Sequence, residues 1–254
     1  MTFKQFLRQA LVLTALGLLL IVLSTSSVNE FGLIGDATGI KREPISRDWE
    51  RWAKYLYTYN YIPANFEGVI LGPSLADNLN PALIKGRRIY NASINGGNFT
   101  ELRILAESII EHNRQVKYLI ICLDPYLTKD YGRKTGYLSR QDYWSAMGSV
   151  DLYRYYYEKI RNRHNGTRDL YNEYGHYDFN RYKDSQDVEQ AIREALKQDR
   201  KWGTDKFKIE EQARRDLAAI VATARENGLL IFAYYYPRPY EIYVQNRDFY
   251  GEFH

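Results

Sequence analysis

The chain has 254 residues, which is enough for one large domain or two small ones with a substantial core. Apolar and charged residues occur in ordinary globular proportions, which excludes an intrinsically disordered chain. The formal net charge of +4 comes from interleaved basic and acidic residues, which excludes a basic nucleic-acid-binding stripe. The 24 tyrosines are unusual: their rings with polar tips suit half-buried surfaces, sugar-binding clefts and interfaces, or a wet core in which tyrosine replaces phenylalanine and leucine.

An uncharged, mostly aliphatic stretch at residues 10–28 predicts a transmembrane anchor, with the lipid bilayer as its partner. At about 1.5 Å per residue it spans roughly 28 Å, close to the hydrocarbon thickness of a bilayer. Lys4 and Arg8 precede the stretch and Glu30 follows it, so the positive-inside rule predicts a single-pass protein with a cytoplasmic N-terminus and a periplasmic (extracytoplasmic) domain. The alternative is a cleaved signal peptide, because residues 24–27 are small, but the apolar stretch is longer than a usual signal core.

The rest of the chain divides into a glycine-bearing linker and one folded domain. Residues 1–28 form the cytoplasmic tip and the anchor, residues 29–47 the linker and residues 48–254 the domain, with a polar, tyrosine-rich helical insertion at about 127–205. Apolar periodicity predicts, in chain order, a helix at 49–57, a strand at 68–71, a helix from 77, a strand at 88–92, a helix at 99–112, a strand at 116–123, insertion helices at 141–161 and 187–201, a helix at 206–226 and a strand at 229–236.

This alternation of strands and helices predicts an α/β fold, an open parallel sheet flanked by helices in the flavodoxin-like manner. The apolar strand at 116–123 is typical of the middle of a sheet that is covered on both faces, and Cys122 within it is expected to be a small core residue. In such sheets the chemistry gathers at the carboxyl ends of the strands.

Three of these strand ends carry polar residues. The first ends in Gly72-Pro73-Ser74, which places a serine hydroxyl on a tight turn in front of a helix N-terminus. The second ends in a turn whose glycines allow close backbone approach and whose asparagine can donate to an oxyanion: Gly96, Gly97 and Asn98. The third places the carboxylate of Asp124 at the rim.

Over residues 67–127 and 207–239 the chain resembles the SGNH (GDSL-like) hydrolase superfamily, and most of all its membrane-anchored bacterial members found with cell-envelope polysaccharide and acyl-transfer systems. The superfamily's first block falls on Gly72-Pro73-Ser74, which implies that Ser74 is the nucleophile. Its second block falls near Asn91 and on Gly96 or Gly97, which implies that a backbone N–H there binds the oxyanion. Asp124 matches the anchored subgroup; the Gly-x-Asn-Asp block is absent, which leaves Asn98 as the candidate for the oxyanion asparagine.

The general base has no clear counterpart. The superfamily supplies an Asp-x-x-His block after the last strand, whereas the histidines of this chain are His112, His164, His176 and His254. His176 lies two residues from Asp178 and is a weak candidate, because chance placement on a loop is more common than a catalytic pair. Pro73 replaces the aspartate of the first block, and an equally simple interpretation of Ser74 is a helix cap.

Two functions follow from this pattern. The first is a non-catalytic or degenerate SGNH-like module that serves as an accessory subunit of a membrane assembly, with other membrane protein subunits as partners. The alternative is a serine esterase or O-acyltransferase that acts through Ser74 on an acylated cell-envelope polysaccharide, which the pattern favours if the native chain continues beyond His254. No cofactor, metal ion or nucleic acid is predicted to bind.

Overall fold

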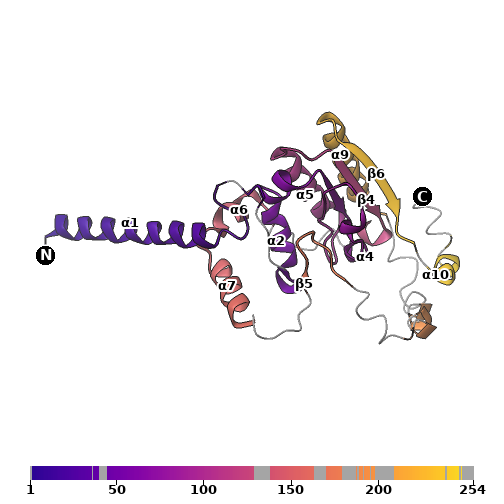
Figure 1. Ribbon diagram of the computed structural model, residues 1–254, viewed down its shortest axis with the longest axis horizontal. Helices are drawn as coiled ribbons and strands as arrows, with labels where there is room; N and C mark the ends of the chain where they lie inside the picture. Colours follow the sequence, from indigo (N-terminus) through magenta and orange to yellow (C-terminus); the bar gives the residue numbers. More distant parts are fainter. Residues whose placement is uncertain are drawn as a thin grey trace.

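A four-stranded parallel sheet forms the centre of the computed structural model, which describes residues 2–35, 37–39, 45–128, 138–162, 170–178, 187, 189–190, 192–194, 196–197, 209–237, 239–245 and 247. The sheet order is β3-β2-β4-β6, and every neighbouring pair is parallel. The strands are β2 (Gly68–Leu71), β3 (Ile89–Asn91), β4 (Tyr118–Leu123) and β6 (Leu230–Tyr235). The prediction of an α/β fold with a parallel sheet flanked by helices is confirmed at this level (Figure 1).

The two faces of the sheet are covered unequally. Alternate residues of β4 point to opposite sides, so Leu119 and Ile121 join the main core while Ile120 and Cys122 pack in a smaller cluster on the other face. The main core includes residues of helices α2 (Glu50–Tyr57), α5 (Phe99–Glu111) and α9 (Glu211–Glu226). The smaller cluster includes Ala76 of the one-turn helix α4 (Ser74–Asp77). The prediction that Cys122 is a core residue is confirmed.

Helix α1 (Phe3–Val28) projects from the domain (Figure 1). Most of its large apolar side chains are exposed as far as Leu23, whereas Ile21 is half-buried. Among the described residues it is the one helix long and apolar enough to cross a membrane. The segment after it was predicted to be a linker, but Phe31, Leu33 and Ala37 are buried in the main core. The glycines that favoured a linker instead turn the chain back, since Gly32, Gly35 and Gly39 all have positive φ.

The insertion differs most from the prediction. The helix expected at 141–161 is two helices, α6 (Arg140–Ala146) and α7 (Val150–Asn162), because the chain turns at Gly148 with φ of 73°. An antiparallel pair that is too short to predict joins β1 (Ile45–Ser46) to β5 (Leu170–Tyr171). The helix expected at 187–201 is described only in part: residues 189–190, 192–194 and 196–197 are helical, as predicted, and residues 188, 191, 195 and 198–201 fall outside the described residues. The remaining helical segments are η1 (Arg47–Trp49), α3 (Tyr61–Asn65), η2 (Pro81–Leu83), η3 (Pro125–Thr128) and α10 (Tyr240–Gln245).

The helix expected from residue 77 onwards is also different. α4 ends at Asp77, and a separate 3₁₀ turn, η2, starts at Pro81. Proline lacks the N–H that would continue a helix, but it suits the first position of a new one, where Asn80 caps the turn through its side chain. The carboxyl end of β2 is therefore followed by a single helical turn and not by a long helix.

Candidate functional site

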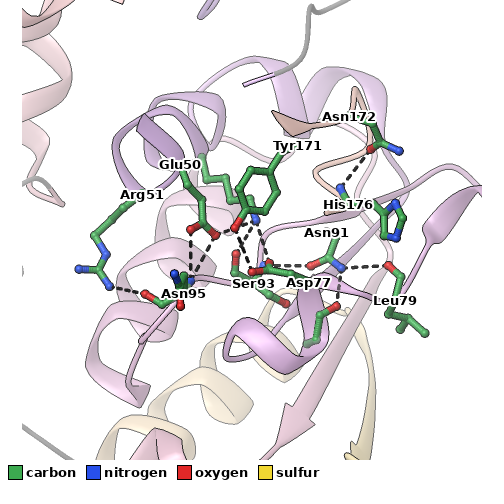
Figure 2. Close-up of polar contacts among 12 residues, drawn as sticks. Glu50, Arg51, Asp77, Leu79, Asn91, Ser93, Asn95, Tyr171, Asn172 and His176 are labelled. Carbon is green, nitrogen blue, oxygen red and sulfur yellow. Dashed lines mark hydrogen bonds and ion pairs between the residues drawn. The ribbon is translucent and has the colours of Figure 1, made fainter. Parts of the chain in front are cut away.

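A tight turn leads from β2 into α4 at the carboxyl edge of the sheet. A Cβ atom on Gly72 would lie 2.7 Å from the Cβ atoms of both Ala76 and Cys122, so only glycine fits between the helix turn and β4. Asn91, at the end of β3, holds the same turn: its Nδ2 donates to the carbonyls of Ala76 (2.7 Å) and Leu79 (3.0 Å) (Figure 2). These contacts fix Ser74, the first residue of α4, at this edge.

A buried lysine stands at the centre of the edge. Lys54 projects from α2 and is 0% exposed. Its Nζ lies 3.1 Å from an oxygen of Glu50 and 3.1 Å from an oxygen of Asp77, and it donates to the carbonyl of Ser93 at 2.6 Å. The ring of Tyr171 covers the ammonium at 4.1 Å, a cation–π contact. We call Glu50, Lys54, Asp77 and Tyr171 the lysine cluster; Figure 2 labels Glu50, Asp77 and Tyr171.

The lysine cluster holds one cation and two carboxylates out of water. Burial, with the charge of Glu50 nearby, raises the pKa of Asp77 from the ordinary 3.8 to about 7, although Lys54 and the hydroxyl of Tyr171 both favour the carboxylate. Burial and the same two carboxylates raise the pKa of Tyr171, so its hydroxyl stays protonated and donates to Asp77 at 3.1 Å. Glu50 also accepts from the backbone N–H of Asn95 at 3.2 Å, which ties the cluster to the turn after β3.

A loop from the insertion closes over the edge. The N–H of Asn91 donates to the carbonyl of Tyr174 at 2.7 Å, and the N–H of Tyr177 donates to the carbonyl of Asp77 at 3.1 Å. Gly175 lies against β3 with φ of 71°, and a Cβ atom there would collide with the carbonyl oxygen of Asn91. The loop therefore packs on the carboxyl end of β3 and on the end of α4, at the edge where parallel sheets usually place their sites.

The predicted nucleophile and base do not meet among the described hydrogen bonds. Ser74 is half-buried, and the N-cap of α4 is Pro73 with no side-chain cap hydrogen bond, so the alternative interpretation of Ser74 as a cap is wrong. His176 is 7% exposed and bonds to the backbone of Asn78; its Nε2 is buried without a partner in the described structure. Burial lowers the pKa of His176, which favours the neutral imidazole.

The predicted oxyanion residues have structural roles in the turn before α5. The N–H of Gly97 donates to the carbonyl of Ile94 at 3.0 Å, and Gly96 has a positive φ of 64°. Asn98 caps α5 in a capping box with Glu101. These residues lie at the predicted edge, and the Gly97 N–H, which would donate to the oxyanion, is already engaged by the carbonyl of Ile94.

Asp124 and His112 complete the set of described candidates. Asp124 is buried after β4 and accepts from the N–H of Tyr126 at 2.9 Å, an Asx turn. His112 ends α5, where its ring nitrogen bonds to the carbonyl of Ser108 and its ring packs on Tyr59. Because α5 runs back from the carboxyl edge, His112 lies away from Ser74. His164 and His254 fall outside the described residues.

A surface cleft of about 520 Å³ adjoins the lysine cluster through Glu50. Three arginines, Arg47, Arg51 and Arg154, line it together with four carboxylates and two tryptophans. Arg51 donates to the carbonyl of Asn95 at 3.0 Å. The indole N–H of Trp49 donates to Glu158 at 2.9 Å and lowers the pKa of that carboxyl, with help from Arg154. The cleft is therefore a mixed-charge, aromatic-walled surface suited to a polar ligand or to a protein.

Sequence reasoning missed the lysine cluster and the cleft. The available signal was the Glu50–Lys54 pair, spaced four residues apart on a helix whose neighbours Trp52, Ala53 and Leu56 are apolar. An ion pair at this spacing normally lies on a solvated face, whereas here it is buried. Nothing in the sequence around Asp77 or Tyr171 indicates that they meet, since they are 94 residues apart.

Fold and site together define a mixed α/β protein with a parallel sheet, an N-terminal helix able to cross a membrane and a buried charged cluster at the carboxyl edge. The described residues contain no group of three or more histidine, cysteine, aspartate or glutamate side chains that could hold a metal ion. Comparisons with known proteins give no family model, no curated protein and no solved structure that matches this chain.

Proposed function

We propose that this chain is a membrane-anchored, extracytoplasmic SGNH-hydrolase-like module without hydrolase activity, acting as an accessory subunit of a membrane assembly. The observation that carries the proposal is the lysine cluster: Lys54, at 0% exposure, is held by two carboxylates and a carbonyl at the strand ends where a hydrolase would keep an accessible crevice. A buried, fully engaged ion cluster stabilises one conformation and leaves little room for a substrate.

The state of the predicted catalytic groups supports the same proposal. A serine needs a base within hydrogen-bond reach and preorganised donors for the oxyanion. Of the two described histidines, His112 bonds to the carbonyl of Ser108, and His176 bonds to the backbone of Asn78. The side-chain amide of Asn91 and the backbone N–H of Gly97 already donate to backbone carbonyls of the domain. α4 is a single turn, so the helix dipole in front of Ser74 is small.

The partner surface in this proposal is the mixed-charge cleft. Arginine and tryptophan are the residues that most often dominate protein interfaces, and this cleft presents both, backed by ion pairs that keep the side chains in place. The membrane topology rests on α1 and on the placement of Lys4 and Arg8 before the apolar stretch. A partner that shares the membrane would meet the cleft at a high local concentration.

A serine esterase or O-acyltransferase is the second candidate. It is favoured by the half-buried position of Ser74 directly after β2, at the edge where the chemistry of such sheets gathers. In this alternative the Ser74 hydroxyl attacks the acyl carbonyl of an acylated envelope glycan, and the acyl group passes to water or to a second hydroxyl.

Hydrolysis by the full chain in detergent micelles separates the two candidates. We expect native protein and the Ser74→Ala variant to release nitrophenol from nitrophenyl acetate, and acetate from acetylated polysaccharide, at the same background rate. Hydrolysis by native protein that the Ser74→Ala change abolishes would reject the non-catalytic assignment. Gentle solubilisation and sizing tests the subunit role: co-migration with other membrane proteins is expected, and an isolated monomer under all mild conditions would contradict it.

A further inference from the structure

Helix α7 has three distinct faces instead of the usual two. At 100° per residue, Leu152 and Tyr155 lie on one face, and both are buried. Asp151, Arg154 and Glu158 lie on a second face and line the cleft. A third face is apolar and yet exposed, with exposures of 82%, 40%, 62% and 71% for Val150, Tyr153, Tyr157 and Ile160. A surface helix of a water-soluble domain normally turns its apolar stripe toward the core, so this stripe requires a partner of its own.

The apolar stripe begins where α1 meets the domain. The hydroxyls of Tyr153 and Ser24 are 2.8 Å apart, and the turn at Gly148 packs on Ile21, so closely that a Cβ atom there would lie 2.5 Å from the Ile21 side chain. Leu23 is still exposed, whereas Thr25 is buried in the domain. The exposed apolar surface of α1 therefore continues into the exposed apolar face of α7.

Two further bonds fix α7 at this place. Glu30, five residues after Thr25, accepts from the hydroxyl of Tyr155 at 2.7 Å and pairs with Nζ of Lys159 at 2.6 Å. The first turn of α7 is thus tied to α1 through Tyr153 and Ser24, and its last turn is tied to the segment after α1 through Lys159 and Glu30. Figure 1 shows α7 running across the axis of α1, on the side of the domain from which α1 projects.

We propose that the apolar face of α7 lies in the headgroup region of the same bilayer that α1 spans. The inference rests on the proposed membrane anchoring of α1. Tyrosine and tryptophan are the residues preferred at this depth, and the isolated aliphatic side chains Val150 and Ile160 gain by leaving water. Arg161, exposed at the border of the stripe, can reach lipid phosphate with its long side chain. Because the exposed apolar surface of α1 continues into that of α7, the bilayer around α1 is the partner that fits this face best.

This placement also orients the cleft. The polar face of α7 is offset by roughly 100° from its apolar face, and a helix is about 10 Å across. The cleft would then open just above the headgroups, and its arginines would point parallel to the membrane surface. That position suits a partner subunit embedded in the same bilayer.

Depth-dependent quenching in bilayers tests the inference. The full chain is reconstituted in nanodiscs of phosphatidylethanolamine and phosphatidylglycerol, with a nitrobenzoxadiazole label on Tyr157→Cys or on Ile160→Cys. Asp151→Cys, on the polar face of the same helix, is the matched control, and Leu16→Cys on α1 reports anchoring. The native chain serves as a labelling blank because its single cysteine, Cys122, is buried. Nitroxide lipids carry the quencher either at the headgroup or in mid-chain.

We expect headgroup nitroxides to quench the labels at positions 157 and 160 several-fold more than the label at position 151, while mid-chain nitroxides quench position 16. Equal, weak quenching at 151, 157 and 160 with a quenched label at position 16 would overturn the placement of α7 and leave the anchor intact. Shielded but unquenched labels at 157 and 160 would also overturn it, in favour of coverage by protein. An unquenched label at position 16 would instead reject the anchoring on which the proposed function depends.

Discussion

The carboxyl edge of the sheet differs from the surface where α1 leaves the domain in which side chains are buried and which are exposed. At the edge, where the sequence places its catalytic-looking residues, polar groups are buried and joined to one another around Lys54. At the exit, where the sequence has no motif, apolar side chains of α7 remain exposed beside α1. The edge thus joins its polar groups to one another, whereas an apolar surface that the described residues leave exposed adjoins the helix that is long and apolar enough to cross a membrane.

The largest effect is expected from removing the central cation. Lys54→Met leaves Glu50 and Asp77 buried without a counter-charge, so the free energy of unfolding of the full chain in detergent should fall by about 3–5 kcal/mol at pH 8. The loss should be smaller at pH 5, where a carboxyl can bind a proton. Lys85→Met, on the exposed surface, is the matched control. A loss below about 1 kcal/mol at pH 8 would mean that the lysine cluster does not stabilise the edge.

The loop over the edge gives the next effect. Gly175→Ala places a methyl group against the carbonyl of Asn91 at a positive φ, so unfolding should cost about 3 kcal/mol less, from overpacking and backbone strain together. Gly228→Ala is a control with the same φ region and open space around it, and about 1 kcal/mol is expected there. Chemical denaturation measures both, and equal losses would show that the loop does not press on β3.

A pH-dependent effect comes from Asp77. Because its pKa is raised from 3.8 to about 7, the folded state binds more protons than the unfolded state between these values, and stability falls as the pH rises through that window. Asp77→Asn removes this proton uptake, so the fall should become shallower by up to about 1.4 kcal/mol per pH unit. Denaturation curves from pH 4 to pH 8 measure it. Parallel curves for native protein and variant would place the pKa of Asp77 near its ordinary value.

The smallest effect is expected at Ser74. Its side chain does not cap α4, so Ser74→Ala should change the free energy of unfolding by less than about 0.5 kcal/mol. The same denaturation assay measures this change. A much larger loss of stability would show that the Ser74 side chain makes a stabilising contact at the edge, and Ser74 would then count among the groups that hold the edge together.

Much of the fold follows from the sequence. The apolar runs of β2, β4 and β6 and the periodicity of α2, α5 and α9 predict those elements to within a few residues, because their core faces are long enough to leave a pattern. The insertion does not follow from the sequence, because the turn at Gly148 packs against Ile21 of α1, which lies 127 residues earlier in the chain. The segment after α1 is a second example. Its glycines predict a flexible linker, whereas the burial of Phe31 in the core holds the segment against the domain.

The site is predicted in part. Sequence order places Ser74, Asn91, Asn98 and Asp124 at one edge of the sheet, and the structure has them there. It cannot show that Lys54 enters that edge from α2 or that Tyr171 covers it from the insertion, because both contacts join distant segments. Short motifs identify residue types at strand ends; the partners that occupy their hydrogen bonds come only from tertiary packing.

The reactivity of Ser74 tests the central claim most directly. Full-length protein in native membranes is treated with a fluorophosphonate, which reacts with activated serines, and the chain is then weighed by intact mass spectrometry. We predict no adduct on Ser74. A stoichiometric adduct that is absent from Ser74→Ala and from denatured protein would contradict a structural edge and establish a serine hydrolase site.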